Sequence, residues 1–201
     1  RPRVVGRGAA WAAAAGGGAQ WGDAGKGGVV DVRATDADLV LRYGGGNNAG
    51  QTVVNPHGHF KLHLIPSGIF YPATRNLLGG GVVINPPALV SELEGLAAAG
   101  FDCANLFISD RAHLVMPYHV LIDPLEERER GTAQLGTTSR GLGPASVDKV
   151  ARRGIRMVDP LEPRAFRAHL TTAPRRTPRL AAGYFRSRRC DPHSRMPLPA
   201  A

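Results

Sequence analysis

Three glycine-rich segments, at residues 16–28, 44–50 and 136–144, constrain the fold of this chain more than any other feature of its sequence. The segments between them alternate between the apolar patterns of short strands and of helices. Strands are expected at residues 38–43, 51–54, 60–64, 82–84 and 105–109, and helices at residues 29–34, 88–99, 117–130 and 145–152. This alternation predicts an α/β fold with a mostly parallel central sheet flanked by helices.

Turn and helix-breaking residues define the boundaries of these elements. Residues 55–59 have the composition of a hairpin turn between two strands. Pro87 is expected to open the helix that Gly100 ends, and Pro124 is expected to interrupt the next helix. Residues 11–15 hold four alanines and predict only a weak first strand, because alanine packs poorly on a pleated sheet.

The net charge of +9 arises at the two ends of the chain. Arg1, Arg3 and Arg7 contribute at one end and residues 171–201, rich in arginine and proline, contribute at the other, whereas residues 8–170 are balanced. We interpret residues 171–201 as a disordered or non-native tail, such as translation out of frame from a GC-rich gene would produce. The alternative is a tail that binds nucleic acid, with an affinity that falls steeply as salt is added. We do not expect nucleic-acid binding to be the function.

Cysteine content and hydropathy exclude other classes of protein. The two cysteines are too few for a disulfide scaffold or a four-cysteine zinc site. No apolar run approaches the roughly 20 residues of a membrane-spanning helix, so no membrane partner is expected. The length of 201 residues suits one domain with appendages.

The first glycine-rich segment resembles a phosphate-binding loop. It reads WGDAGKGG over residues 21–28, and glycines let backbone N–H groups approach phosphate oxygens at a helix N-terminus. Lys26 would add a point charge for the phosphates. The segment is not a Walker A motif, because Gln20 replaces its first glycine and Gly27 stands where Ser or Thr would bind magnesium. Asp23 is then the obvious carboxylate for a metal, and an ordinary surface turn is the alternative.

The other two glycine-rich segments carry groups suited to a polar, planar ligand. Residues 44–52, GGGNNAGQT, offer amides that can both donate and accept hydrogen bonds to a base or a phosphate. Residues 136–144, GTTSRGLGP, add hydroxyls and an arginine. The cations of residues 148–156 follow on a predicted helix.

Six strings in a fixed order resemble adenylosuccinate synthetase over about residues 18–170. They are GAQWGDAGKG, RYGGGNNAGQTVV, FKLHLIPSGI, ISDRAHLVMPYH, GTTSRGLGPA and DKVARRGIR. The resemblance covers the N-terminal part of that family and implies a truncated, P-loop-like nucleotide-binding architecture. We therefore divide the chain into an N-terminal extension with a weak first strand (1–15), a synthetase-like nucleotide-binding region (16–170) and the tail (171–201).

The resemblance also implies an activity. The family uses GTP and Mg²⁺ to ligate L-aspartate to IMP, which gives adenylosuccinate, GDP and phosphate in the first committed step from IMP to AMP. Phosphorylation of the 6-oxygen of IMP makes that oxygen a leaving group, which the aspartate amine displaces. A cytoplasmic homodimer with shared active sites is expected for such an enzyme.

The family's functional positions map onto this sequence through the matched strings. Asp23 corresponds to the general base and Gln51 to the position of the catalytic acid. Asp23 and the Gly50 carbonyl correspond to the metal ligands. The GTP positions are Gly22, Asp23, Ala24, Gly25, Lys26, Gly27, Gly28, Gly50, Gln51 and Thr52. The IMP positions are Asp23, Ala24, Gly25, Lys26, Asn48, Ala49, Gly50, Gln51, Thr138 and Arg152, of which Arg152 reaches the IMP of the partner subunit.

Departures from the family pattern bear on activity. Gln51 stands where the family has a catalytic histidine, and glutamine cannot deliver a proton at neutral pH. Ala24 replaces a glutamate, and Gly80 and Asn85 replace an asparagine and an aspartate. The family's C-terminal region, which reads the guanine ring and the substrate aspartate, has no counterpart in the matched strings. We expect a chain that turns over poorly or not at all, and the alternative is a non-catalytic fragment that binds IMP and GTP.

Individual residues also have simpler interpretations. Asp23 could cap the helix that follows it, and Arg152 could be one more solvated cation. His63 and His113 fit packing roles better than catalytic ones, and Cys103 fits a small core residue.

Overall fold

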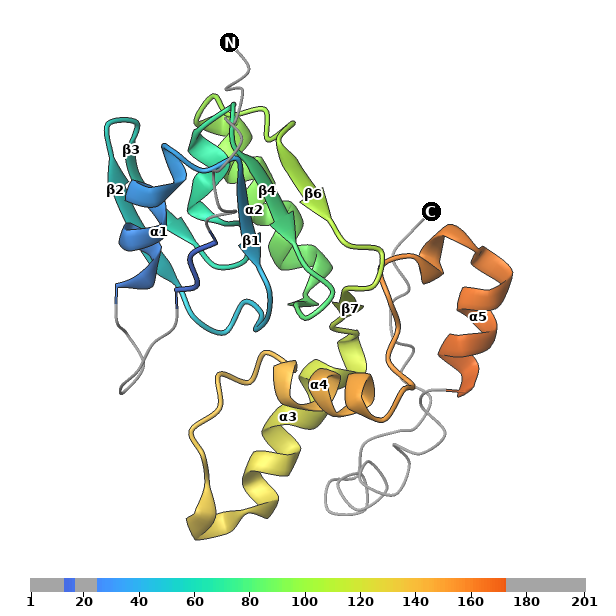
Figure 1. Cartoon of the computed structure of the whole chain (residues 1–201). Helices are drawn as coiled ribbons and strands as arrows, with labels where there is room; N and C mark the ends of the chain where they lie inside the picture. Colours follow the sequence, from blue (N-terminus) through green and yellow to red (C-terminus); the bar gives the residue numbers. More distant parts are fainter. Residues whose placement is uncertain (1–12, 17–24, 173–201) are drawn as a thin grey trace.

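Three short parallel strands form the central sheet of the computed structural model, which describes residues 13–16 and 25–172 (Figure 1). The strands β1 (Leu39–Arg42), β4 (Arg75–Leu78) and β6 (Leu106–Ile108) lie in the order β1-β4-β6. Leu41 of β1 is in register with Leu77 of β4, which is in register with Phe107 of β6. The predicted α/β class with a mostly parallel sheet is therefore confirmed.

Two smaller strand pairs lie outside this sheet. The strands β2 (Gln51–Asn55) and β3 (Gly58–Leu62) form the predicted antiparallel hairpin, and β5 (Val83–Ile84) pairs in parallel with β7 (His113–Leu114). The second hairpin strand begins two residues before its predicted start, at Gly58. The reason is the φ of +136° at Gly58, which ends the turn early in a conformation that other residues rarely adopt.

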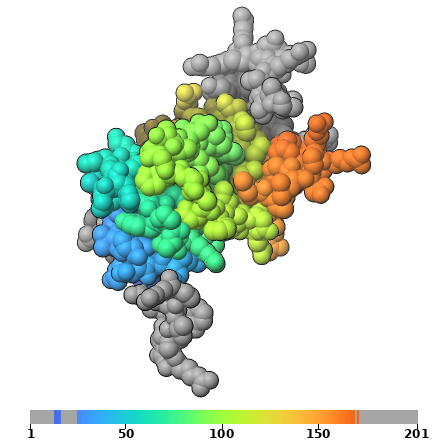
Figure 2. Space-filling view, turned by 90° about the horizontal axis from the view of Figure 1, so that it is seen from above, coloured from blue at the N-terminus to red at the C-terminus, as the bar shows by residue number. Residues whose placement is uncertain are grey.

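Five α-helices surround the strands in the described residues. They are α1 (Lys26–Ala34), α2 (Pro86–Ala98), α3 (Pro117–Glu129), α4 (Leu142–Val150) and α5 (Pro163–Thr172), with short 3₁₀ helices η1 (Ser67–Phe70), η2 (Gly131–Ala133) and η3 (Asp159–Leu161). Figure 1 shows α2 behind the sheet and α3 and α4 below it. The β2–β3 hairpin and α5 lie at opposite ends of the molecule (Figure 2). No helix in the described ranges is long and apolar enough to cross a membrane.

The helix α2 covers one face of the sheet. It starts at Pro86 rather than at the predicted residue 88, because the Asn85 side chain caps it by accepting a hydrogen bond from the Ala88 amide at 3.2 Å. A proline at the first helical position costs no hydrogen bond. Leu89 and Leu96 of α2 and Leu78 of β4 are buried in the same apolar cluster. The cap thus sets the register that presents the leucines to the sheet.

The central strand β4 was not predicted from the sequence. Its four residues are RNLL, and Asn76 in the middle is fully buried. The Asn76 side chain donates to the Thr74 carbonyl at 3.0 Å, and Asn105 donates to the same carbonyl at 3.0 Å. A buried asparagine tied to neighbouring backbone breaks the apolar pattern by which a central strand is normally recognised.

Several boundaries predicted from the sequence were wrong. The helix α3 runs through Pro124 without the expected interruption, since a proline removes a single backbone donor and the turns on both sides remain bonded. The helix α4 begins at Leu142, inside the segment predicted as loop. Residues 13–15 form no strand, and residues 11 and 12 lie outside the described part of the chain. The strand β7 and the helix α5 had no sequence prediction.

Candidate functional site

The described part of the first glycine-rich segment is the turn that starts α1. Gly25 adopts φ +62° and accepts hydrogen bonds from the Gly28 and Val29 amides, so the helix begins at Lys26. A glycine in the left-handed region followed directly by a helix N-terminus is a geometry suited to an anion. The predicted residues Gly22, Asp23 and Ala24 lie outside the described residues, as does the rest of the range 17–24.

The second glycine-rich segment lies against the first turn of α1. A Cβ atom at Gly27 would lie 2.8 Å from both Cβ and Oε1 of Gln51, which means that the two residues are in close contact. The Gln51 side chain donates to the Ile65 carbonyl at 3.2 Å, and the Ser67 hydroxyl donates to the Gly27 carbonyl at 3.2 Å. The structure therefore brings together two of the predicted nucleotide-binding segments, which the sequence separates by more than 20 residues.

The remaining predicted residues of this segment are exposed. Gly50 packs against His63, whose Nε2 would be 3.2 Å from a Cβ at that position. Asn48, Ala49 and Gly50 are exposed in the loop, and Thr52 is exposed on β2. The position of His63 agrees with a packing role.

A partly buried arginine connects the loop to the neighbouring segment. The Arg42 guanidinium donates to the carbonyls of Gly46 at 2.5 Å, Leu64 at 3.0 Å and His63. Burial lowers the pKa of Arg42 and the nearby Glu92 raises it, with a net lowering. Hydrogen bonds from a charged donor are stronger than neutral ones. Arg42 thus fixes residues 44–46 relative to residues 63 and 64. Sequence reasoning did not predict this role of Arg42.

Glu92 of α2 binds the backbone amides of residues 63–65, the segment whose carbonyls Arg42 contacts. Its carboxylate accepts hydrogen bonds from the amides of His63 at 2.9 Å, Leu64 at 2.9 Å and Ile65 at 3.1 Å. The segment 63–65 is therefore bonded through its carbonyls to Arg42 and through its amides to Glu92. Because Ile65 also accepts from Gln51, this pair of charges positions the second loop.

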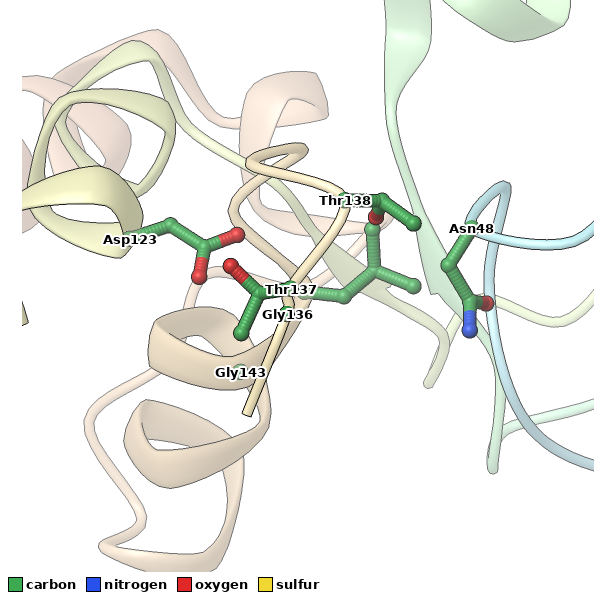
Figure 3. A pocket seen from close by; sticks show the side chains of 7 residues that line it. Asn48, Asp123, Gly136, Thr137, Thr138 and Gly143 are labelled. Carbon is green, nitrogen blue, oxygen red and sulfur yellow. The ribbon is translucent and has the colours of Figure 1, made fainter. Parts of the chain in front are cut away.

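A pocket of about 260 Å³ joins the second and third glycine-rich segments (Figure 3). It is lined by Asn48, Asp123, Gly136, Thr137, Thr138, Leu142 and Gly143. Figure 3 shows Asn48 on one side and Asp123 and Thr137 on the other, with Thr138 between them. Two of the predicted IMP positions, Asn48 and Thr138, therefore line one cavity although 90 residues separate them.

Buried polar contacts shape the wall of this pocket. The Asp123 carboxylate of α3 accepts from the Gly141 amide at 2.8 Å, and Gly141 has φ +75° at the start of α4. The Arg140 side chain donates to the Asn47 carbonyl, which ties the third loop to the second. The Oδ1 atom of buried Asn47 has no hydrogen-bond partner within the described residues. Sequence reasoning missed Asp123 as a wall residue, because only the packing of α3 on α4 shows that its carboxylate holds the start of α4.

The helices α3 and α4 are joined by a buried histidine. His119 is fully buried, and its Nδ1 accepts from the Met116 amide at 2.9 Å. Nδ1 is therefore unprotonated, and Nε2 carries the hydrogen that His119 donates to Asp148 at 3.0 Å. Burial lowers the pKa of His119, against the opposing effect of Asp148. The same carboxylate accepts from Arg153 at 2.5 Å.

The electrostatics around Asp148 agree with a neutral histidine and an ionised acid. Burial acts to raise the pKa of Asp148, but the hydrogen bonds from His119 and Arg153 outweigh it and lower the pKa. Burial, followed by the Asp148 charge, raises the pKa of Tyr118 to about 12. The cluster holds α4 against α3 and so fixes the pocket wall.

Arg152 is exposed at the end of α4 in an unusual backbone conformation. Its φ is +59°, and the amides of Arg152 and Arg153 donate to the carbonyls of Lys149 and Asp148 at 3.1 and 3.0 Å. These two bonds form a Schellman motif, in which glycine normally occupies the left-handed position. An arginine in that conformation carries local backbone strain, and Arg152 is exposed.

The described residues contribute few ligands for a metal. They contain no group of three or more His, Cys, Asp and Glu side chains that could hold a metal ion by themselves. The Gly50 carbonyl lies in the loop that contacts the first turn of α1, where a phosphate would be bound. This arrangement fits Mg²⁺, which proteins often hold with one or two groups of their own together with substrate phosphates.

A parallel sheet, a glycine turn into a helix and two polar loops beside it define an α/β protein of the nucleotide-binding type. The sequence model of the adenylosuccinate synthetase family matches residues 17–195, and the chain belongs to that family.

Individual relatives support the assignment to this family. Adenylosuccinate synthetase from Dehalococcoides mccartyi is 58% identical over 153 residues, which are 76% of this chain and 36% of the relative. The Mycobacterium leprae enzyme is 56% identical over 147 residues, 73% of this chain and 34% of the relative. The chain thus spans about a third of the length of these proteins.

Solved structures show the same relationship. Fully ligated adenylosuccinate synthetase from Plasmodium falciparum superposes with a TM-score of 0.73 at 34% identity, over 81% of this chain and 38% of that one. The cyanophage S-2L succinoaminodeoxyadenylate synthetase, bound to dGMP and dATP, gives a TM-score of 0.55 at 26% identity, over 71% and 39%.

Proposed function

We propose that this chain carries the IMP-binding and phosphate-binding part of an adenylosuccinate synthetase. The reaction is the GTP- and Mg²⁺-dependent ligation of L-aspartate to IMP, giving adenylosuccinate, GDP and phosphate. The observation that carries the proposal is the family match over residues 17–195, a range that includes the pocket lined by Asn48 and Thr138, and relatives of that name reach 58% identity. We also propose that it acts in the cytoplasm as a homodimer, as the family resemblance implies.

The residues around the pocket receive roles from this proposal. Asn48 and Thr138 orient IMP by hydrogen bonds from an amide and a hydroxyl. The first turn of α1, from Gly25 to Gly28, binds the GTP phosphates through its backbone amides. Arg152 extends toward the IMP of the partner subunit, which would explain why its strained backbone is retained.

Asp23 and Gln51 correspond to the two residues that assist phosphoryl transfer in this scheme. Asp23 takes the proton of the purine, so that the 6-oxygen of IMP becomes the nucleophile, and the Gly50 carbonyl and Asp23 hold Mg²⁺. When bound, Mg²⁺ neutralises charge on the phosphates. Gln51 is fixed between Gly27 and the Ile65 carbonyl, where it can donate a hydrogen bond but no proton. Loss of a general acid costs on the order of 10²–10⁴ in rate, so turnover should be poor.

Binding and turnover distinguish the enzyme from the alternative, a non-catalytic module that binds IMP and GTP. That alternative is favoured by Gln51 and by the third of the family's length that the chain matches. A coupled assay with IMP, GTP and aspartate measures turnover, and calorimetric titration of IMP and GTP, each with and without Mg²⁺, measures binding. Binding without turnover supports the module, and a rate near that of a full-length relative rules it out.

A matched pair of threonine variants tests the pocket. Thr138→Ala should weaken IMP binding about tenfold, because a lost hydrogen bond is worth about 1–1.5 kcal/mol. Thr35→Ala is the control, because its hydroxyl lies exposed after α1 and donates a hydrogen bond to the Val32 carbonyl at 2.9 Å. Equal IMP affinities for the two variants would contradict the assignment of the pocket.

A further inference from the structure

The third glycine-rich segment has no regular secondary structure where it carries its threonines. In the part of the chain that the structure describes, residues 134–140 form no hydrogen bond from backbone to backbone. Thr137 and Thr138 are exposed although they line the pocket. An exposed segment without such bonds has many accessible conformations, and ordering it costs conformational entropy. Contacts with other elements must therefore place these two threonines.

Two carboxylates of α3 bond to the two ends of this segment. The Glu127 carboxylate accepts a hydrogen bond from the Gly136 amide at 2.6 Å, and the Asp123 carboxylate accepts one from the Gly141 amide at 2.8 Å. Asp123 and Glu127 are one helical turn apart, so they lie on the same face of α3. Figure 3 shows the Asp123 carboxylate facing the segment, beside Thr137. We call these two side chains the carboxylate pair.

The two ends of the segment differ in how they contact α3. A Cβ atom at Gly141 would lie 2.7 Å from the backbone nitrogen of Val120, so this end lies directly against the helix. A Cβ atom at Gly136 would meet nothing within 4 Å. The first end of the segment is thus held through the hydrogen bond to Glu127, and the second end is held by packing together with Asp123.

Asp123 also caps the helix that continues from the segment. The helix α4 has Gly141 at its N-cap position, where no side chain of its own can accept a hydrogen bond. Asp123 is 5% exposed and supplies this acceptor from the neighbouring helix. A carboxylate is stabilised at a helix N-terminus, and a buried carboxylate requires such partners. Loss of the Asp123 carboxylate would therefore loosen the start of α4 together with the pocket wall.

We propose that Asp123 and Glu127 are positioning residues for the IMP pocket, which hold both ends of the segment so that Thr138 faces the ligand. The identity of the ligand rests on the proposed function, whereas the attachment of the segment does not. Release of either end lowers the fraction of molecules whose segment is ready to bind, and the apparent affinity for IMP falls by the same factor. The affinity for GTP stays unchanged, because its phosphates bind at the first turn of α1.

Calorimetric titration of the full chain with IMP and with GTP tests the proposal. Glu127→Ala and Asp123→Ala should each weaken IMP binding about tenfold, because a hydrogen bond to a charged acceptor is lost. Glu127→Gln and Asp123→Asn keep an acceptor oxygen and should weaken it only about threefold. GTP affinity should equal that of the wild type in all four variants. Glu127→Ala should fold normally, because Glu127 is only partly buried and alanine favours a helix.

Asp102→Asn is the matched control. The Asp102 carboxylate also accepts a hydrogen bond from a backbone amide, that of Ala104 at 3.0 Å, but it lies in the turn before β6 and does not line the pocket. Its affinities for IMP and GTP should match the wild type. Unchanged IMP affinity in Glu127→Ala overturns the proposal, as does an equal loss in Asp102→Asn. An equal loss of GTP affinity in the α3 variants also overturns it, because that result indicates a general loss of structure.

Amide hydrogen exchange measured by NMR separates this inference from the proposed function. In Glu127→Ala the Gly136 amide should exchange about tenfold faster than in the wild type, because the hydrogen bond that protects it is lost. Unchanged exchange overturns the proposal. Absence of IMP binding by the wild-type chain would refute the proposed function and the ligand named here, and the exchange rate of Gly136 would then decide by itself whether the carboxylate pair positions the segment.

Discussion

Two adjacent glycines in α1 respond to the same substitution in opposite ways. Gly27 and Gly28 both lie in the first turn of the helix, and alanine at either site removes backbone freedom from the unfolded chain. At Gly28 a Cβ atom would meet nothing within 4 Å, so Gly28→Ala should stabilise the chain by about 0.5 kcal/mol. At Gly27 the Cβ would lie 2.8 Å from Cβ and Oε1 of Gln51.

The contact at Gly27 cannot be relieved by rotation of a side-chain end, since one of the two atoms is the Cβ of Gln51. Forcing an extra methyl group into a packed site costs about 1–3 kcal/mol, so Gly27→Ala should be less stable than Gly28→Ala by about 2 kcal/mol. Urea unfolding without nucleotide, followed by far-ultraviolet circular dichroism, measures the difference at an unchanged m-value. Equal stabilities would refute the contact between the first turn of α1 and the second loop. Partial recovery in the double variant Gly27→Ala, Gln51→Ala would locate the clash at the glutamine side chain.

Three further predictions concern catalysis, pH and backbone strain. Gln51→His should raise any residual synthetase rate by restoring a proton donor, and an unchanged rate in the coupled assay would count against that role. Because its pKa is lower in the folded chain, His119 binds a proton more readily in the unfolded chain; stability should therefore fall as pH drops below about 6.5, by up to about 1.4 kcal/mol per pH unit. In His119→Gln that slope of unfolding free energy against pH should flatten, and an identical slope would exclude this histidine as its source. Arg152→Gly should raise stability by about 1 kcal/mol by removing left-handed strain, while IMP affinity measured by calorimetry falls; a loss of stability would contradict the strain.

Local patterns in the sequence were sufficient for much of the fold. The apolar segment at 38–43, the turn at 55–59 and the proline and glycine that bound α2 each act within a few residues, so β1, the hairpin and α2 could be predicted. The strand β4 could not, because buried Asn76 is acceptable only where the Thr74 carbonyl accepts its side chain. The predicted interruption at Pro124 was wrong for a similar reason. The helix α3 continues through this proline because its packing against α4 supports it.

The sequence by itself determined the kinds of chemistry available: glycine turns for anions, amides and hydroxyls for a base, and motifs that resemble one family. The tertiary structure decided which of those groups meet. Only packing places Asn48 and Thr138 in one pocket and Gln51 against Gly27. Packing also brings Arg42 to the carbonyls of residues 63 and 64 and Glu92 to the amides of residues 63–65. The physical reason is that a hydrogen bond or a steric contact acts over a few ångströms in space, whereas sequence patterns report neighbours along the chain.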